Sequence, residues 1–161
     1  MAKDLNTTPY ASSYTSIEQK DCLTLDSDNL GSIQECESFS DIKVKVIEGD
    51  IRQSITLTRN EKEYELEFCS TVSSAFSSLG SKIEWRHKKQ EPEKLKGMIV
   101  RLEVNDDPDD MEHISSYLVV SKITNDNICV VGKILPQENQ NEVARKMLDS
   151  STKLPCLKKE K

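Results

Sequence analysis

The chain has 161 residues, a formal net charge of −6 and a pI near 5.1, and 35% of its residues are hydrophobic. A single domain of this size can bury enough apolar surface to form its own core. The acidic balance argues against nucleic-acid binding, which requires a basic face. No apolar run approaches the roughly 20 residues that span a bilayer, so we expect a protein that does not cross a membrane.

The N-terminal part carries little periodicity. Residues 1–13 are polar and rich in serine and threonine, and we expect a disordered leader there. Ser16 and Gln19 have the spacing of a capping box, which predicts a short helical turn near 17–21. The polar stretch 26–31 is predicted to be a loop.

A period-two pattern begins at residue 42, where apolar residues alternate with lysines through residue 46. A glycine-containing turn at 48–50 leads to a second alternating run, which predicts a hairpin. The same reasoning gives the predicted strands 42–46, 51–58, 64–68, 82–86, 98–104, 117–123 and 128–134. The last two are apolar on consecutive residues, as in central strands that are covered on both faces.

The serine-rich segment 70–81 interrupts this rhythm and is predicted to be a structured loop with Phe76 and Leu79 turned inward. Near the end of the chain, Asn139 and Glu142 offer a helix cap, and apolar residues share one face of a helix at about 140–149.

We therefore predict a mainly β (α+β) protein: one antiparallel sheet of about seven strands, curled or sandwich-like, with a C-terminal helix. No β-α-β alternation is present, which excludes a doubly wound nucleotide-binding fold. The expected organisation is a single domain over 14–150, followed by a disordered basic tail at 151–161.

The cysteines bear on the cellular compartment. None lies in a Cys-x-x-Cys pair and there are only two histidines, so we expect no metal site. Cys22 and Cys36 flank the polar loop, and in an oxidising compartment a bridge between them would stabilise the fold by about 3 kcal/mol. Cys156, in the tail, is then the unpaired cysteine. No signal peptide is visible, so two interpretations stay open: a cytoplasmic protein, or an exported one whose signal has been removed.

Several short sequence strings along the chain, taken together in their order and spacing, carry a resemblance to a known group of proteins. It comprises Tyr14, Thr15, Ser16, Cys22, Cys36, 48–52, Phe76, Gly80, 84–86, 100–102, 117–123, 129–134, Asn141, Ala144 and Arg145. Together these residues resemble a group of small exported bacterial proteins of unknown function, over residues 14–149. The resemblance implies a periplasmic or secreted protein with oxidised cysteines, and it implies no activity. Cys69 departs from the pattern, either as a partner of Cys129 or as a buried thiol.

Two groups of charged residues are candidate sites. Glu48, Asp50 and Arg52 alternate on the predicted hairpin, and Glu84 and Arg86 flank Trp85 in a later strand. Alternate residues of a strand share a face, so such carboxylates can act as an acid and base pair if they meet in one cleft. The alternatives are turn chemistry and cross-strand ion pairs. Trp85 is either an exposed binding anchor or the core residue of an aromatic-poor chain.

Two further groups of residues have the chemistry of a site. The acidic loop holds enough oxygens for calcium but lacks the spacing of an EF-hand, so a solvated hairpin tip is favoured; its residues are Asp106, Asp107, Asp109, Asp110, Glu112 and His113. Cys129 with His87 or His113 is a candidate nucleophile, although a thiol in an apolar strand is typically a small hydrophobe or half of a disulfide.

The chain lacks the motifs G-x-S-x-G and H-E-x-x-H and a phosphate-binding glycine loop, and we expect no cofactor. The preferred hypothesis is a non-catalytic, monomeric exported protein that binds another protein or an envelope component. The alternatives are a secreted inhibitor or effector that acts through the loop 70–81, and a hydrolase or transferase that uses Glu48, Asp50 and Glu84.

Overall fold

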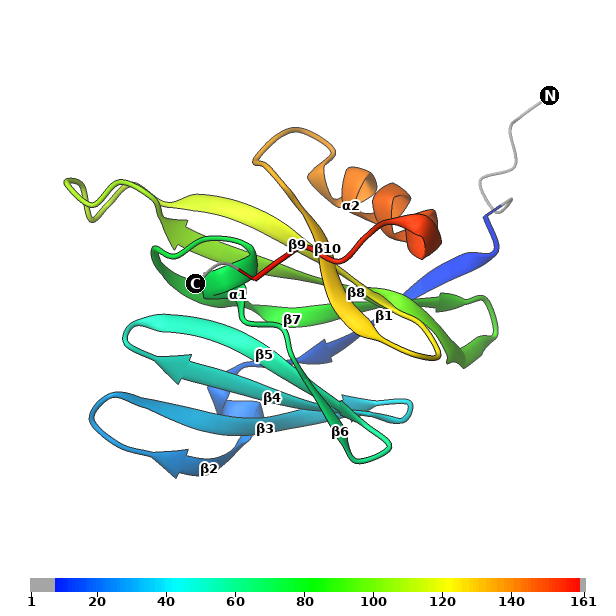
Figure 1. Cartoon of the computed structure of the whole chain (residues 1–161), viewed down its shortest axis with the longest axis horizontal. Coiled ribbons are helices and arrows are strands. Elements are labelled where there is room, and N and C mark those ends of the chain that lie inside the picture. Colours follow the sequence, from blue (N-terminus) through cyan, green and yellow to red (C-terminus); the bar gives the residue numbers. More distant parts are fainter. Residues whose placement is uncertain (1–7, 160–161) are drawn as a thin grey trace.

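The computed structural model describes residues 8–159, which fold into two antiparallel five-stranded sheets packed face to face (Figure 1). The strands are β1 (Tyr10–Ser16), β2 (Leu23–Ser27), β3 (Gly31–Phe39), β4 (Ile42–Gly49), β5 (Arg52–Arg59), β6 (Lys62–Glu65), β7 (Phe76–Lys88), β8 (Glu91–Asn105), β9 (Ser115–Ile123) and β10 (Ile128–Ile134). The helices are α1 (Phe68–Thr71) and α2 (Gln140–Asp149), with 3₁₀ turns η1 (Gln19–Asp21) and η2 (Ser151–Lys153).

The chain order explains the two layers. Sheet A has the order β1-β7-β8-β9-β10, and sheet B has the order β2-β3-β4-β5-β6. After β1 the chain crosses to the other layer, builds all of sheet B as a meander, and returns through α1 to complete sheet A as a second meander. Both meanders run through short turns, as antiparallel neighbours permit.

The predicted fold class is confirmed in outline, because the protein is mainly β, antiparallel and has a C-terminal helix at the predicted residues. The number of strands was wrong, since β1, β2 and β3 were missed. All five residues of β2 are exposed, so this strand has no alternating pattern to detect. In β1 and β3 the buried positions include the polar residues Thr15 and Gln34, so neither sequence shows the alternation of apolar and polar residues that marks a strand.

Three expected irregular segments are instead ordered. Residues 10–13 of the expected leader belong to β1 and pair with β7, while residues 1–7 lie outside the described part. The predicted loop 70–81 shrinks to 72–75, because α1 precedes it and β7 follows. In the expected disordered tail, residues 151–153 form η2 and Cys156 ties the segment to β10, while residues 160–161 lie outside the described part.

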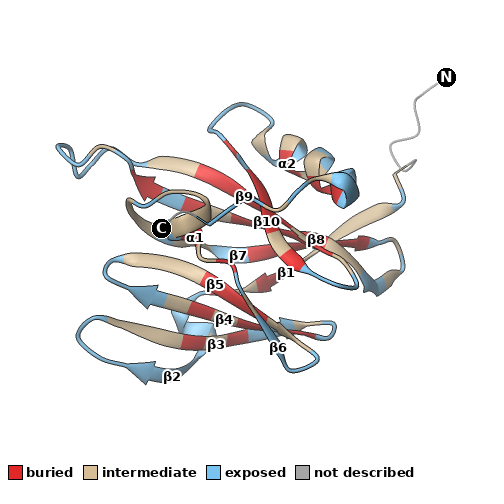
Figure 2. Ribbon diagram, in the orientation of Figure 1, coloured by how far each residue is buried: buried red, intermediate tan, exposed pale blue. Residues whose placement is uncertain are grey.

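The main core lies between the sheets, where the inner faces of the strands are buried (Figure 2). Trp85 is fully buried at its centre, stacks on Phe39 with ring centroids 5.3 Å apart, and donates a hydrogen bond of 2.8 Å from Nε1 to Thr15 Oγ1. Because the indole N–H has a partner, the ring is buried without an unsatisfied donor. The interpretation of Trp85 as a core residue is confirmed, and an exposed anchor is excluded.

A second core lies on the outer face of sheet A, where α2 packs (Figure 1). Ala144 and Leu148 are fully buried there, against Val120 of β9 and Val131 of β10. The prediction that β9 and β10 are covered on both faces is thus confirmed, but only β9 is a central strand, since β10 is an edge of sheet A. No helix within residues 8–159 is long and apolar enough to cross a membrane.

Two disulfides brace the fold. Cys22–Cys36, the predicted pair, joins the start of β2 to β3, and Cys129–Cys156 fastens the C-terminal segment to β10. The predicted pairing of Cys69 with Cys129 was wrong, and so was the expectation that Cys156 is free. Cys69 is the free cysteine and it is exposed, not buried. Two disulfides indicate an oxidising, extracellular environment.

The two bridges make a measurable prediction about stability. Replacing both Cys22 and Cys36 by serine should lower the free energy of unfolding by about 3 kcal/mol, because the unfolded chain regains the entropy of the closed loop. Urea unfolding measures this loss. Cys69→Ser is the matched control and should change stability by less than about 0.5 kcal/mol. Equal stabilities of the double variant and the control would show that the bridge contributes nothing.

Candidate functional site

Four connecting segments gather at one end of the sandwich, on the left in Figure 1, and we call this surface the loop end. It comprises residues 26–31, 48–52, 72–76 and 105–114. Hydrogen bonds join the segments in sequence: Asp50 N–H donates to the Leu30 carbonyl at 3.0 Å, and Arg52 Nε donates to the Ser74 carbonyl at 2.7 Å. Phe76 then pairs with Asn105 at the base of the acidic loop. The loop end is therefore one continuous, fastened surface.

The β4–β5 turn is strained at an exposed residue, Ile51. Asp50 and Ile51 have φ values of 53° and 60°, so this two-residue turn places both in the left-handed region. Aspartate tolerates that region, but a β-branched residue rarely adopts it. Ile51 is also 61% exposed, so its side chain gains no burial in return for the strain. Strain of this kind concentrates at functional sites.

Arg52 links two segments of the loop end, the β4–β5 turn and the segment 72–76. It forms an ion pair of 3.0 Å with Asp50, and its guanidinium lies 4.9 Å from the ring centroid of Phe76. With the bond to Ser74, these contacts hold the turn against the loop 72–75. Glu48 is exposed and accepts a hydrogen bond of 3.2 Å from Gln53 Nε2. The predicted trio of Glu48, Asp50 and Arg52 therefore lies together, but as an open hairpin tip and not as a catalytic cleft.

The acidic loop is held by its own aspartates. Asp107 Oδ1 accepts from the Asp109 N–H at 3.0 Å, and Asp110 Oδ1 accepts from the Glu112 N–H at 3.0 Å. Asp106 accepts from the Tyr117 hydroxyl at 3.0 Å and lies 3.2 Å from His113 Nε2. Across residues 8–159, no three acidic, histidine or cysteine side chains converge as ligands for one metal ion. The loop is an exposed hairpin tip between β8 and β9, which agrees with the solvated tip that the sequence favoured.

These contacts perturb two ionisable groups. Hydrogen bonding by Ser115, with smaller contributions from Tyr117 and His113, lowers the pKa of Asp106 despite its partial desolvation. Burial, together with the hydrogen bond to Asp106, raises the pKa of Tyr117. The Asp106 carboxylate is thus kept ionised to lower pH than an ordinary aspartate, which anchors the loop to β9.

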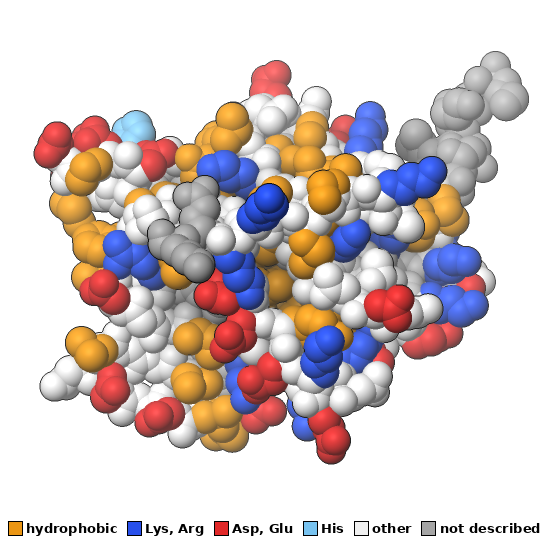
Figure 3. Space-filling view, in the orientation of Figure 1, with side chains coloured by type: hydrophobic (Ala, Val, Ile, Leu, Met, Phe, Trp, Pro, Cys, Tyr) orange, Lys and Arg blue, Asp and Glu red, His pale blue; other side chains and the backbone are white. Residues whose placement is uncertain are grey.

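The loop end combines exposed apolar tips with a strongly acidic rim. Leu30 is 77% exposed, Met111 64% and Ile114 52%, in addition to Ile51. Nine acidic side chains surround them, against one arginine and one histidine: Asp26, Asp28, Glu48, Asp50, Asp106, Asp107, Asp109, Asp110 and Glu112. Outside this set the chain has slightly more basic than acidic residues. Figure 3 shows hydrophobic and acidic side chains along the left edge, where these segments lie.

A hollow of about 420 Å³ lies between the loop 72–76 and the acidic loop, lined by Arg52, Phe76, Asn105, Asp106 and Met111 among others. Its walls are mainly apolar with charged groups at the edge, which is the composition of a site for a partner's side chain. The sequence did not identify Leu30, Ile51, Met111 and Ile114 as functional. The available signal was a large apolar residue inside turn segments otherwise made of polar residues, glycine and proline.

The other predicted site residues lie elsewhere. Glu84 and Arg86 of β7 are both buried, on the outer face of sheet A beneath α2. Arg145 Nε donates to Glu84 Oε2 at 2.6 Å, and Arg86 pairs with Asp149 at 2.7 Å. Ser12 connects the two pairs, because it donates to Glu84 at 2.6 Å and accepts from Arg86 at 3.0 Å. This network docks the helix and leaves neither residue free for a ligand.

The proposed acid and base pair therefore loses its geometric support. Glu48 and Asp50 lie in solvent at the loop end, whereas the Glu84 carboxylate is saturated by Ser12 and Arg145. The thiol hypothesis was wrong, because Cys129 is in a disulfide. His87 is buried and is hydrogen-bonded to Ser13 and to the Lys88 carbonyl.

No protein-family model matches the chain, and searches of curated proteins and of solved structures find no significant match. The function must therefore be inferred from the geometry.

The network under α2 gives a stability prediction. Glu84→Gln removes a buried charge and should lower the free energy of unfolding by about 2 kcal/mol, since the half-buried Arg145 then lacks its partner. Glu48→Gln, the same change at the exposed tip, should stay within about 0.5 kcal/mol of wild type. Urea unfolding compares the two. If both variants unfold alike, the network is not what holds the helix.

The acidic loop gives a titration prediction. NMR titration should place the pKa of Asp106 below 3.8, and Ser115→Ala should raise it toward that ordinary value, with a smaller rise for Tyr117→Phe. Because the folded-state pKa is depressed, the stabilisation by this carboxylate is present above the unfolded pKa and is lost as pH falls through the folded one. An Asp106 pKa that neither variant moves would contradict the assigned hydrogen bonds.

Proposed function

We propose that this protein is a non-catalytic, monomeric exported module that binds a partner protein through the loop end. The single observation that carries the proposal is the placement of four exposed apolar side chains among nine acidic ones on a fastened surface. Large apolar side chains exposed together on a soluble domain are typical of interaction sites. The two disulfides support export, to the periplasm or the exterior of a bacterial cell.

Charge complementarity selects the class of partner. A rim of aspartates and glutamates favours a surface rich in lysine and arginine and raises the rate at which such a surface is encountered. The apolar tips supply the affinity, because their removal from water contributes about 25 cal/mol per Å² of buried apolar area. The partner we propose therefore has an apolar centre within a basic surface.

An inhibitor or effector role is a version of this proposal in which the partner is disabled by the contact. The fastening of the loop 72–75 by Arg52 favours it, since a binding loop that is rigid beforehand loses less entropy on association. The predicted binding loop of such a protein is accordingly shorter than 70–81 and acts together with the acidic loop.

Identification of the partner can be tied to the surface. A photo-cross-linking amino acid at position 111, within the loop end, should capture one partner in the native compartment, and the cross-linked segment should be basic. The same group at position 135 is the control, because Leu135 is also exposed, at 55%, but lies beyond β10. Equal capture of the same proteins from both positions would mean that the tips attract proteins nonspecifically.

Variants then test the purified complex. Ile51→Asn should weaken binding at least about fivefold, as loss of an interface anchor does. It should also stabilise the free protein by about 1 kcal/mol, because asparagine tolerates the left-handed region. Asp109→Lys should slow association and flatten its salt dependence, whereas Asp126→Lys, in the β9–β10 turn, should not. Unchanged affinity in Ile51→Asn and Asp109→Lys would refute the loop end as the binding surface.

A further inference from the structure

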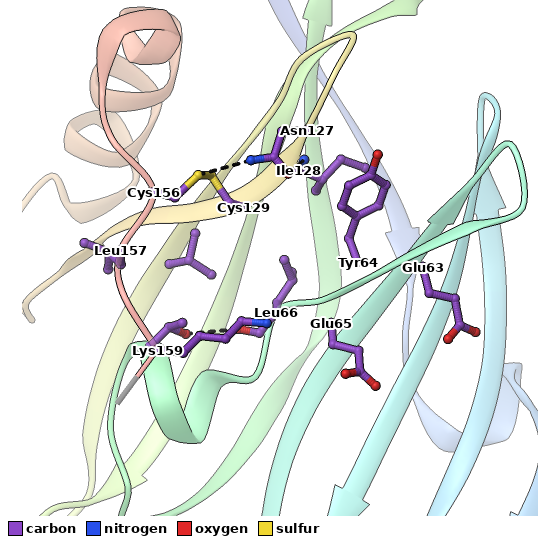
Figure 4. Close-up of a pocket in the computed structure, with 12 residues that line it drawn as sticks. Glu63, Tyr64, Glu65, Leu66, Asn127, Ile128, Cys129, Cys156, Leu157 and Lys159 are labelled. Atoms are coloured by element: carbon purple, nitrogen blue, oxygen red, sulfur yellow. Dashed lines mark hydrogen bonds between the residues drawn. A yellow bond between two sulfur atoms is a disulfide. The ribbon is translucent and has the colours of Figure 1, made fainter. Parts of the chain in front are cut away.

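The two sheets leave an open seam on one side of the sandwich, between β6, an edge of sheet B, and β10, an edge of sheet A. A groove of about 510 Å³ occupies this seam (Figure 4). Leu66, Ile128 and Val130, which are core residues, line it, so the groove reaches the interior of the protein. The seam is distinct from the loop end, because the two share no lining residues.

One edge of the seam presents unpaired backbone groups. The Leu66 N–H donates to the Ile55 carbonyl at 3.0 Å, so residues 66 and 64 direct their backbone groups at β5. Because these directions alternate along a strand, the N–H and C=O groups of Glu63 and Glu65 point away from β5. Among residues 8–159 they have no backbone partner. Such a row of donors and acceptors is a template for another strand.

The side chains of β6 divide between two faces. In Figure 4, Tyr64 and Leu66 point toward the seam, where Ile128 faces them, whereas Glu63 and Glu65 point the other way. Glu63 forms an ion pair with Lys45 at 3.3 Å. Glu65 has no ion pair within the described part of the chain. A strand added to β6 would thus meet an apolar groove on one face and a free carboxylate on the other.

The opposite edge already binds an extended segment of this chain. After η2 the C-terminal segment passes along β10, and the Leu157 N–H donates to the Val130 carbonyl at 2.8 Å. The Cys129–Cys156 disulfide fixes this segment, and Lys159 pairs with Glu67 at 2.7 Å. The β10 edge is therefore partly occupied, whereas no segment of residues 8–159 pairs with the outer edge of β6 across the groove.

We propose that the β6 edge binds an extended peptide of alternating apolar and basic residues, which adds as a sixth strand to sheet B. Its apolar side chains enter the groove beside Tyr64 and Leu66, and its basic side chains lie beside Glu65. Main-chain hydrogen bonds to Glu63 and Glu65 supply affinity, and the alternation supplies specificity. Opposite charges on neighbouring strands add to the pairing.

The probe is an acetylated, amidated hexapeptide in which valine and lysine alternate, added to the oxidised full chain. Amide exchange measured by NMR at Glu63 and Glu65 is the direct readout, because these two N–H groups are open in the free protein and become hydrogen-bonded in the complex. Saturating peptide should slow their exchange at least about tenfold. A peptide with the same composition in two blocks, three valines then three lysines, should not.

Two changes separate strand addition from simple charge attraction. N-methylation of alternate peptide amides keeps the charge but removes the donors, and should weaken binding at least about tenfold. Glu65→Lys should weaken it at least about threefold, whereas Glu93→Lys, the same change at an exposed position of β8, should not. Asp109→Lys at the loop end should leave peptide affinity unchanged, so the β6 site is tested separately from the proposed partner of the loop end. Absence of binding at millimolar peptide, or binding without protection of Glu63 and Glu65, overturns the proposal.

Discussion

Strand β7 is the element on which the rest of the structure depends, because both of its faces are buried. On the inner face Trp85 fills the core between the sheets and stacks on Phe39 of sheet B. On the outer face Glu84 and Arg86 bind Arg145 and Asp149 of α2. One strand therefore fixes both the distance between the sheets and the position of the helix. The charged pair around Trp85 is not a binding site, because both of its side chains are already engaged in holding α2.

Both faces of the central strands of sheet A are occupied, and the two recognition surfaces that we propose lie at an end and at an edge of the sandwich. The loop end is fastened by backbone hydrogen bonds and by Arg52, so it presents its apolar tips in one arrangement. Ile51 lowers the stability of the protein, because a β-branched residue with φ of 60° is strained. Its exposed side chain adds nothing to the core in return. The seam differs from the loop end, because what it offers to a ligand is a row of unpaired backbone groups on β6 and not a set of exposed side chains.

Residue patterns predicted the part of the fold in which burial alternates with period two. They gave the β4–β5 hairpin, strands β7 to β10, the helix α2 and the Cys22–Cys36 bridge. They failed for β2, which has no buried face, and for Cys129–Cys156, since a disulfide between a strand and a distant tail has no local signal. The candidate site was predicted in part: Glu48, Asp50 and Arg52 are at the loop end, but its apolar tips belong to three segments that only the tertiary fold brings together.

Methyl NMR tests the central claim, that the loop end is the binding surface, most directly. In protein labelled at isoleucine, leucine and methionine methyl groups, titration with the cross-linked partner should shift the signals of Leu30, Ile51, Met111 and Ile114. The signals of Leu135 and of Leu148, which is buried under α2, should stay in place. Shifts confined to Leu135, Leu148 or the methyl groups that line the seam, with unmoved tips, would contradict the account.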